Sequence, residues 1–155
     1  IVKILLPRPV GDHAHGASDV VRGDMVGGSE RILVVEDDAL VRVFLENALS
    51  QLGYKVVTVG DASEALALLG SHSSIDLLVA DIVLPRGMNG RELAATLKAT
   101  HPDMAVLFIS GYPDQEFGTE SDGSSPALKK PFQVLDLAQR IRDAIDQKAA
   151  EKVTT

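Results

Sequence analysis

Residues 76–85 read DLLVADIVLP, and this stretch decides the fold. An uninterrupted apolar run ends at Asp81, and a loop over Ile82–Met88 follows. A short continuous apolar run predicts a strand that is buried on both faces, which is typical of a parallel sheet covered by helices. We therefore predict a strand over Ile75–Ala80, with Asp81 directly after it.

The sequence on both sides of this stretch alternates between short apolar runs and apolar residues at helical spacing. Further strands are predicted at Arg31–Val35, Tyr54–Val59, Met104–Ile109 and Ala127–Lys129. Helical spacing is found at residues 40–52, 65–69, 93–97 and 134–145. Strands that alternate with helices predict an α/β fold, a doubly wound five-stranded parallel sheet with helices on both faces.

Polar residues and glycine mark the ends of the predicted helices. Asp38 is the expected N-cap of the first helix, and Gly53 is expected to close it. Asp61 and Glu64 form a predicted capping box. In this capping box, Asp61 accepts a hydrogen bond from the Glu64 amide, and the Glu64 side chain reaches back to the backbone amide of the cap residue.

Composition excludes several classes of protein. Hydrophobic residues make up 45% of the 155 residues but aromatic residues only 4%, so the core must consist mainly of aliphatic side chains. The net charge of −7 argues against nucleic-acid binding, which needs a basic stripe. The absence of cysteine excludes disulfides and thiolate metal sites. No apolar run approaches the ~20 residues that span a bilayer, so we expect no direct membrane contact. The absence of cysteine is compatible with a reducing cytoplasm, and a cytoplasmic location is the expectation.

Candidate functional residues come directly after four of the predicted strands. Glu36 and Asp37 follow the first strand, Asp81 the third, Ser110 the fourth and Lys130 the fifth. The carboxyl ends of parallel strands share one edge, where doubly wound folds bind their ligands. We therefore expect all of these side chains to converge in one crevice.

The residue types in this crevice predict phosphoryl chemistry. Three carboxylates repel one another unless a cation joins them, and oxygen ligands with room for water suit Mg²⁺. A carboxylate beside Mg²⁺ can act as a nucleophile toward phosphorus. Phosphoryl transfer then needs positioning and neutralisation of charge, for which Lys130 supplies a mobile cation and Ser110 a hydroxyl donor.

Four motifs together closely resemble those of the response-regulator receiver family. They are ILVVEDD (32–38), DLLVADIVLP (76–85), VLFISGY (106–112) and LKKPF (128–132), and the resemblance covers residues 30–147. It implies a phosphoacceptor domain of a two-component phosphorelay, which takes a phosphoryl group from a phosphohistidine and switches conformation. Such a domain catalyses only its own phosphorylation and dephosphorylation.

The resemblance also implies a role for each acidic residue. Asp81 is the expected phosphoacceptor and also contacts Mg²⁺. Asp37 is the expected direct metal ligand, and Glu36 is expected to bind the ion through water. The backbone carbonyl of Val83 is the third expected protein ligand.

Other implications concern the fold and the switch. The resemblance implies the strand order 2-1-3-4-5, a cis Lys130–Pro131 peptide, and contacts of Ser110 and Lys130 with the phosphoryl group. Ser110 is expected to move inward on phosphorylation. The chain departs from the family at Ala127, where an aromatic residue is usual. We therefore expect the signal to travel mainly through Ser110 and the polar segment 113–125.

Three further stretches resemble parts of hybrid histidine kinases. LPRGMNGRELA (84–94) and FISGY (108–112) look like receivers at the C-terminal end of such kinases. IVKILLPRP (1–9) is similar to the last strand of a histidine-kinase ATPase domain. The sequence begins with Ile rather than Met, so we expect a piece of a longer protein. The expected parent is a histidine kinase, whose organisation allows a membrane anchor.

This resemblance predicts the domain organisation and the partners. Residues 1–10 are the expected remnant of the ATPase domain, 11–28 a linker, 29–150 the receiver and 151–155 a tail. The expected phosphodonor is the phosphohistidine domain of a histidine kinase, in the same or another chain. A histidine phosphotransfer protein is a further candidate partner.

Two other functions are weighed against this one. A phosphatase of the haloacid-dehalogenase kind also uses an Asp nucleophile with Mg²⁺, but it needs a second Asp where this chain has Val83. A degenerate receiver that only binds partners would have lost the acceptor, an acidic residue or the Lys, and all are present. Tyr112 fits either a packing residue or a gate over the site.

Overall fold

The computed structural model describes residues 27–70, 74–111 and 127–154. The elements within these ranges are β1 (Arg31–Val35), α1 (Ala39–Gln51), β2 (Lys55–Val59), α2 (Ala62–Leu69), β3 (Leu77–Asp81), α3 (Gly90–Thr100), β4 (Ala105–Ser110), β5 (Ala127–Lys129) and α4 (Val134–Val153). The expectations for residues 1–10, most of the linker 11–28, Tyr112 and the segment 113–125 fall outside the described residues.

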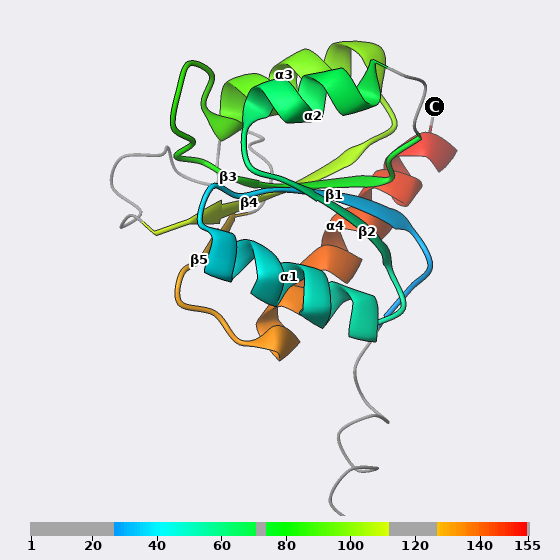
Figure 1. Cartoon of the computed structure of the whole chain (residues 1–155). Helices are drawn as coiled ribbons and strands as arrows, with labels where there is room; N and C mark the ends of the chain where they lie inside the picture. Colours follow the sequence, from blue (N-terminus) through cyan, green and yellow to red (C-terminus); the bar gives the residue numbers. More distant parts are fainter. Residues whose placement is uncertain (1–26, 71–73, 112–126, 155) are drawn as a thin grey trace, which may run out of the picture.

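The strands form one parallel sheet in the order β2-β1-β3-β4-β5. Helices α1 and α4 cover one face of the sheet, and α2 and α3 cover the other (Figure 1). The predicted fold class and strand order are therefore confirmed.

The sheet separates two hydrophobic clusters. Successive side chains of a strand point to opposite faces, so Ile32 and Val34 of β1 pack in the cluster with α1 and α4, whereas Leu33 and Val35 pack with α2 and α3. The central strands β3 and β4 are buried along their whole length. Burial on both faces explains the uninterrupted apolar runs that the sequence places there.

Two central strands end one residue later than predicted. β3 ends at Asp81 rather than Ala80, and β4 ends at Ser110 rather than Ile109. The parallel ladder causes this, since Asp81 lies opposite Ile109 and the Ile82 amide donates to the Ile109 carbonyl at 2.9 Å. Main-chain pairing continues past the last apolar side chain. Asp81 and Ser110 thus belong to the sheet itself rather than to loops.

The predicted helix ends are confirmed with one change. The Asp38 carboxylate accepts hydrogen bonds from the first-turn amides of α1, and Gly53 follows the helix with φ +95°. Asp61 accepts from the Glu64 amide at 2.9 Å. The Glu64 carboxylate, however, accepts from the Gly60 amide at 2.8 Å rather than from the cap residue, so it ties the β2–α2 loop one residue further back.

The last helix continues beyond the expected end of the receiver at residue 150. α4 runs through Val153, so residues 151–153 of the expected tail are helical. Lys152 near its end pairs with Asp103 at 3.2 Å, which ties this end of the helix to the loop before β4. No helix among the described residues has the length and apolar content needed to cross a membrane.

Helix α3 packs tightly on the end of β3 that carries Asp81. Asn89 and Glu92 form a complete capping box at its start. The Gly90 amide then donates to the Ile82 carbonyl at 3.0 Å. A Cβ atom on Gly90 would collide with the Asp81 carbonyl and lie 3.2 Å from the Ile82 Cα. The absence of a side chain at Gly90 therefore sets how closely α3 approaches the acceptor residue.

Replacing Gly90 by alanine tests this close approach. We expect Gly90→Ala to lower the free energy of unfolding by about 1–3 kcal/mol, because backbone atoms must move to admit the methyl group. Gly70→Ala is the matched control, since Gly70 has φ −62° and its Cβ would lie at an ordinary 3.4 Å from the Leu66 carbonyl oxygen. Urea titrations of both variants and the wild type give the comparison, and equal midpoints for all three would contradict the packing described here.

Candidate active site at the carboxyl edge of the sheet

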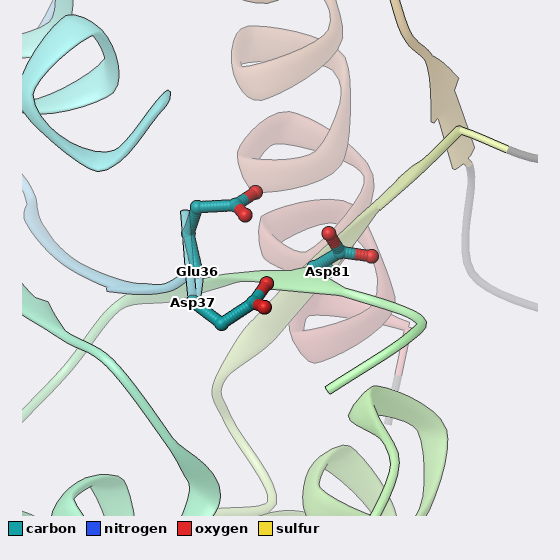
Figure 2. Close-up of side chains that lie close together, drawn as sticks. All are labelled: Glu36, Asp37 and Asp81. Atoms are coloured by element: carbon teal, nitrogen blue, oxygen red, sulfur yellow. The ribbon is translucent and has the colours of Figure 1, made fainter. Parts of the chain in front are cut away.

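Three carboxylates converge where the sequence predicts them. Asp81 is the last residue of β3, and Glu36 and Asp37 follow β1. Each offers an oxygen atom, and these oxygens lie within 4.8 Å of one another. Figure 2 shows the side chains of Glu36 and Asp37 pointing toward that of Asp81. Glu36 and Asp81 are buried, whereas Asp37 is exposed, so the cluster opens to solvent on the side of Asp37.

Lys130 joins the two buried carboxylates. Its Nζ atom lies 2.7 Å from Asp81 Oδ2 and 2.8 Å from Glu36 Oε2, and its side chain is 24% exposed. The convergence of Lys130 on Asp81 was predicted. Its pairing with Glu36 was not, because the motif relates Lys130 to the phosphoryl group rather than to the acidic residue of β1.

Burial and pairing act in opposite directions on the charges of this pair. Burial raises the pKa of Glu36 above its usual 4.5, although hydrogen bonds from Lys130 and the Asp38 amide favour its charged form. Burial likewise disfavours the ammonium of Lys130, but the hydrogen bonds to Asp81 and Glu36 outweigh it and raise the Lys130 pKa above 10.5. Lys130 is therefore held in its charged form.

The residues present fit a divalent cation. Three carboxylates and the one ammonium of Lys130 leave two negative charges, which a divalent ion would balance. All the donors are oxygen atoms, which Mg²⁺ prefers, and the exposed side leaves room for the waters that it keeps. Within the described part of the chain, no hydrogen bond or ion pair engages the Asp37 carboxylate. The chemistry of the donor set thus supports the predicted Mg²⁺ site.

The carboxylate of Asp81 is oriented from both sides. Its Oδ1 atom accepts a hydrogen bond from the Val83 amide at 2.9 Å, while Oδ2 pairs with Lys130. Sequence reasoning missed this role of the Val83 amide, although an Asp two residues before a loop amide is a known local pattern. The proposed role of the Val83 carbonyl as a metal ligand stays a prediction.

Ser110 lies beside this cluster at the end of β4. It is buried, with an exposed fraction of 6%, and it pairs in register with Lys129 of β5. The Lys130 amide donates to the Ser110 carbonyl at 2.7 Å. The Lys130–Pro131 peptide is cis, as predicted. The backbone therefore places Ser110 and Lys130 next to each other.

A second feature missed by sequence reasoning is Arg42 of α1. Its Nη1 atom donates to the Glu36 carbonyl at 2.7 Å and approaches the Asp37 carbonyl at 3.5 Å. No motif identifies this contact. The sequence does place Arg42 one turn into the helix that follows the acidic residues, and this position could have indicated the contact.

An apolar groove borders the cluster on the side of α1. It runs from the first turns of α1 to the chain between β5 and α4. Its lining residues are Leu40, Val41, Phe44, Gly111, Lys130, Pro131 and Phe132. Leu40 is 83% exposed and Phe44 41% exposed, and the Phe44 ring lies 6.1 Å from that of Phe132. Large apolar side chains are thus exposed next to Lys130.

Comparisons with known proteins agree with this geometry. The chain is 32% identical to the sensor kinase CckA of Brucella abortus over 94% of its own length, but it spans only 16% of that kinase. It is 37% identical to the response regulator receiver protein CpdR of the same organism, with 72% of this chain and 93% of CpdR covered.

A solved structure and a family match complete the comparison. The crystal structure of a response regulator receiver protein from Sinorhizobium medicae superposes with a TM-score of 0.70 and 27% identity, covering 77% of this chain and 97% of that one. The sequence profile of the response regulator receiver domain family matches residues 32–142, a range that includes every site residue described above. The match covers most of the chain, and the fold and the acidic cluster agree with it. The chain therefore belongs to the family of response regulator receiver domains.

Proposed function

We propose that this domain accepts a phosphoryl group from a phosphohistidine onto Asp81, with Mg²⁺ bound by Asp37, Glu36, Asp81 and the Val83 carbonyl. The observation that carries the proposal is the position of the Asp81 carboxylate, held between the Val83 amide and the Lys130 ammonium beside two further carboxylates. Such a carboxylate is a nucleophile with a cation ready for the charge of the transferred group.

The transfer exchanges one bond to phosphorus for another. An oxygen of Asp81 forms the new O–P bond while the bond between phosphorus and the imidazole nitrogen of the donor breaks, and the electron pair of that bond stays on the nitrogen. Lys130 moves its ammonium from the Asp81 carboxylate to a phosphoryl oxygen, and Ser110 donates its hydroxyl to another. Bound Mg²⁺ supplies further neutralisation of the phosphoryl oxygens.

We propose that the domain is the C-terminal receiver of a hybrid histidine kinase that acts in the cytoplasm. The similarity to the sensor kinase CckA supports this, since it covers 94% of the chain and so reaches beyond the receiver domain itself. In this organisation residues 1–10 belong to the kinase ATPase domain and 11–28 to a linker. The donor is then a histidine of the same kinase, of another kinase or of a phosphotransfer protein.

The apolar groove beside Lys130 is the proposed docking site for the donor. Leu40 and Phe44 are exposed on the helix that follows Glu36 and Asp37, so a donor domain that covers them lies beside the acidic cluster. Exposed apolar side chains around a polar centre are typical of a protein interface.

The proposed switch starts at Ser110. A move of its hydroxyl toward the phosphoryl group draws in the end of β4, and the neighbouring strand offers little resistance. Ala127 of β5, which pairs with Phe108, is exposed and has no ring to relocate. The response is therefore proposed to continue into the segment 113–125 rather than through an aromatic side chain.

The acceptor assignment predicts phosphorylation of one residue. Wild-type protein with Mg²⁺ and acetyl phosphate should gain one phosphoryl group, and Asp81→Asn should gain none because an amide is a far weaker nucleophile. Intact-protein mass spectrometry measures both. If Asp81→Asn and the wild type are labelled to the same extent, Asp81 is not the acceptor.

The metal assignment predicts a stabilisation that depends on Asp37. Mg²⁺ at about ten times its dissociation constant should raise the free energy of unfolding by about 1.4 kcal/mol, since it binds only the folded state. Asp37→Asn should lose most of this gain. Asp38→Asn is the matched control, because Asn also caps helices well and the exposed charge removed is adjacent. Thermal melts with Mg²⁺ and with EDTA decide it; an undiminished gain in Asp37→Asn would contradict the ligand set.

The docking site predicts a loss specific to protein donors. Leu40→Gln should slow transfer from an autophosphorylated histidine kinase about tenfold, as expected for a central interface residue. Labelling by acetyl phosphate should be unchanged, because this small donor needs no docking. Val153→Gln, which replaces the 88% exposed Val153 at the far end of α4, is the control. Equal slowing with both donors would place the effect of Leu40 in the site itself.

A further inference from the structure

We infer that Arg42 is a positioning residue that fixes the direction in which Asp37 presents its carboxylate to the metal. The inference rests on the proposed Mg²⁺ site, and it concerns a side chain that touches neither the ion nor the acceptor. The main evidence for this role is the hydrogen bond of 2.7 Å that Arg42 Nη1 donates to the Glu36 carbonyl.

The contact acts on Asp37 through the peptide plane. The carbonyl of Glu36 and the amide nitrogen of Asp37 belong to one planar unit, so a donor that holds the carbonyl also fixes the rotation of the peptide that leads into Asp37. The weaker approach of Nη1 to the Asp37 carbonyl, at 3.5 Å, places the same guanidinium against the next peptide. Arg42 thus restrains the backbone on both sides of the Asp37 Cα atom.

Asp37 depends on this restraint more than its neighbour does. The Glu36 carboxylate is anchored twice, by the Asp38 amide at 3.1 Å and by Lys130 at 2.8 Å. The Asp37 carboxylate is exposed, and no such anchor is found for it in the described residues. With no side-chain anchor, the position of this carboxylate follows from its backbone.

The guanidinium of Arg42 lies close to several backbone segments beside the carboxylates. Arg42 lies in the first turns of α1, where its own amide donates to the Asp38 carbonyl at 2.9 Å. A Cβ atom on Gly60 would lie 3.2 Å from Arg42 Nη1, so the guanidinium rests against the chain between β2 and α2. The Glu36 amide also donates to the Val59 carbonyl at 3.2 Å. The Arg42 guanidinium therefore lies where α1 meets the ends of β1 and β2, and its hydrogen bonds go to the end of β1.

Positioning and charge predict opposite effects, which makes the inference testable. A guanidinium near the acidic cluster repels a metal cation, so its removal would strengthen Mg²⁺ binding if charge dominated. Loss of the hydrogen bond instead loosens the peptide that leads into Asp37 and weakens binding. Supporting groups behind metal ligands contribute about tenfold or more in affinity.

The test measures Mg²⁺ affinity and phosphorylation separately in Arg42→Met. Amide chemical shifts of residues 36–38 and 81 during a Mg²⁺ titration give the dissociation constant, which should rise about tenfold. The rate of labelling by acetyl phosphate should need correspondingly more Mg²⁺ but reach a wild-type value at saturation, because the acceptor and Lys130 are unchanged. A general structural defect would lower the saturated rate as well.

Two variants complete the experiment. Arg42→Lys keeps the charge but loses the planar donor group, so its affinity should fall between those of the wild type and Arg42→Met. Arg140→Met removes an exposed arginine from α4 and should bind Mg²⁺ as the wild type does. Melts in EDTA confirm that each variant is folded.

The outcomes separate this inference from the proposed function. If the wild type binds Mg²⁺ and Arg42→Met binds it equally well or more tightly, the positioning role is refuted and the metal site stands. A saturated labelling rate that falls with affinity unchanged refutes it too. If the wild type binds no Mg²⁺, the proposed metal site fails, and the role of Arg42 fails with it.

Discussion

The ammonium of Lys130 between Glu36 and Asp81 is the interaction on which the site depends. Glu36 is 1% exposed, and burial raises its pKa, whereas the hydrogen bond from Lys130 favours its charged form. Asp81 is 7% exposed and pairs with the same ammonium at 2.7 Å. Lys130 comes from the end of β5 and the carboxylates from β1 and β3, so only the folded sheet brings the three together. The functional charge arrangement is thus a product of topology.

The order of the strands explains why one edge can hold all of these groups. β1 and β3 are neighbours at the centre of the sheet, and β4 and β5 follow on one side. Their carboxyl ends deliver Glu36, Asp81, Ser110 and Lys130 in that spatial order. The helices pack on the two faces and leave this edge to the loops, as Figure 1 shows. Gly90 at the start of α3 packs against the backbone carbonyl of Asp81.

Most of the fold could be predicted from the sequence because its signals are local. Apolar runs predict the strands, and the residues at their ends predict the edge that binds ligands. The errors have a physical origin. β3 and β4 extend to Asp81 and Ser110 because main-chain pairing does not stop at a polar side chain. The contacts of Lys130 with Glu36 and of Arg42 with the Glu36 carbonyl join residues of different elements, and no periodicity encodes such distances.

The two adjacent acidic residues differ in a way that fits their proposed roles. Both oxygens of the Glu36 carboxylate already accept hydrogen bonds, one from the Asp38 amide and one from Lys130. A carboxylate engaged in this way suits contact with a metal through water, which leaves its existing bonds in place. Asp37 is exposed beside it and faces the same cluster, so its oxygens suit direct coordination. The proposed division between an indirect and a direct ligand therefore agrees with which carboxylate the protein has already anchored.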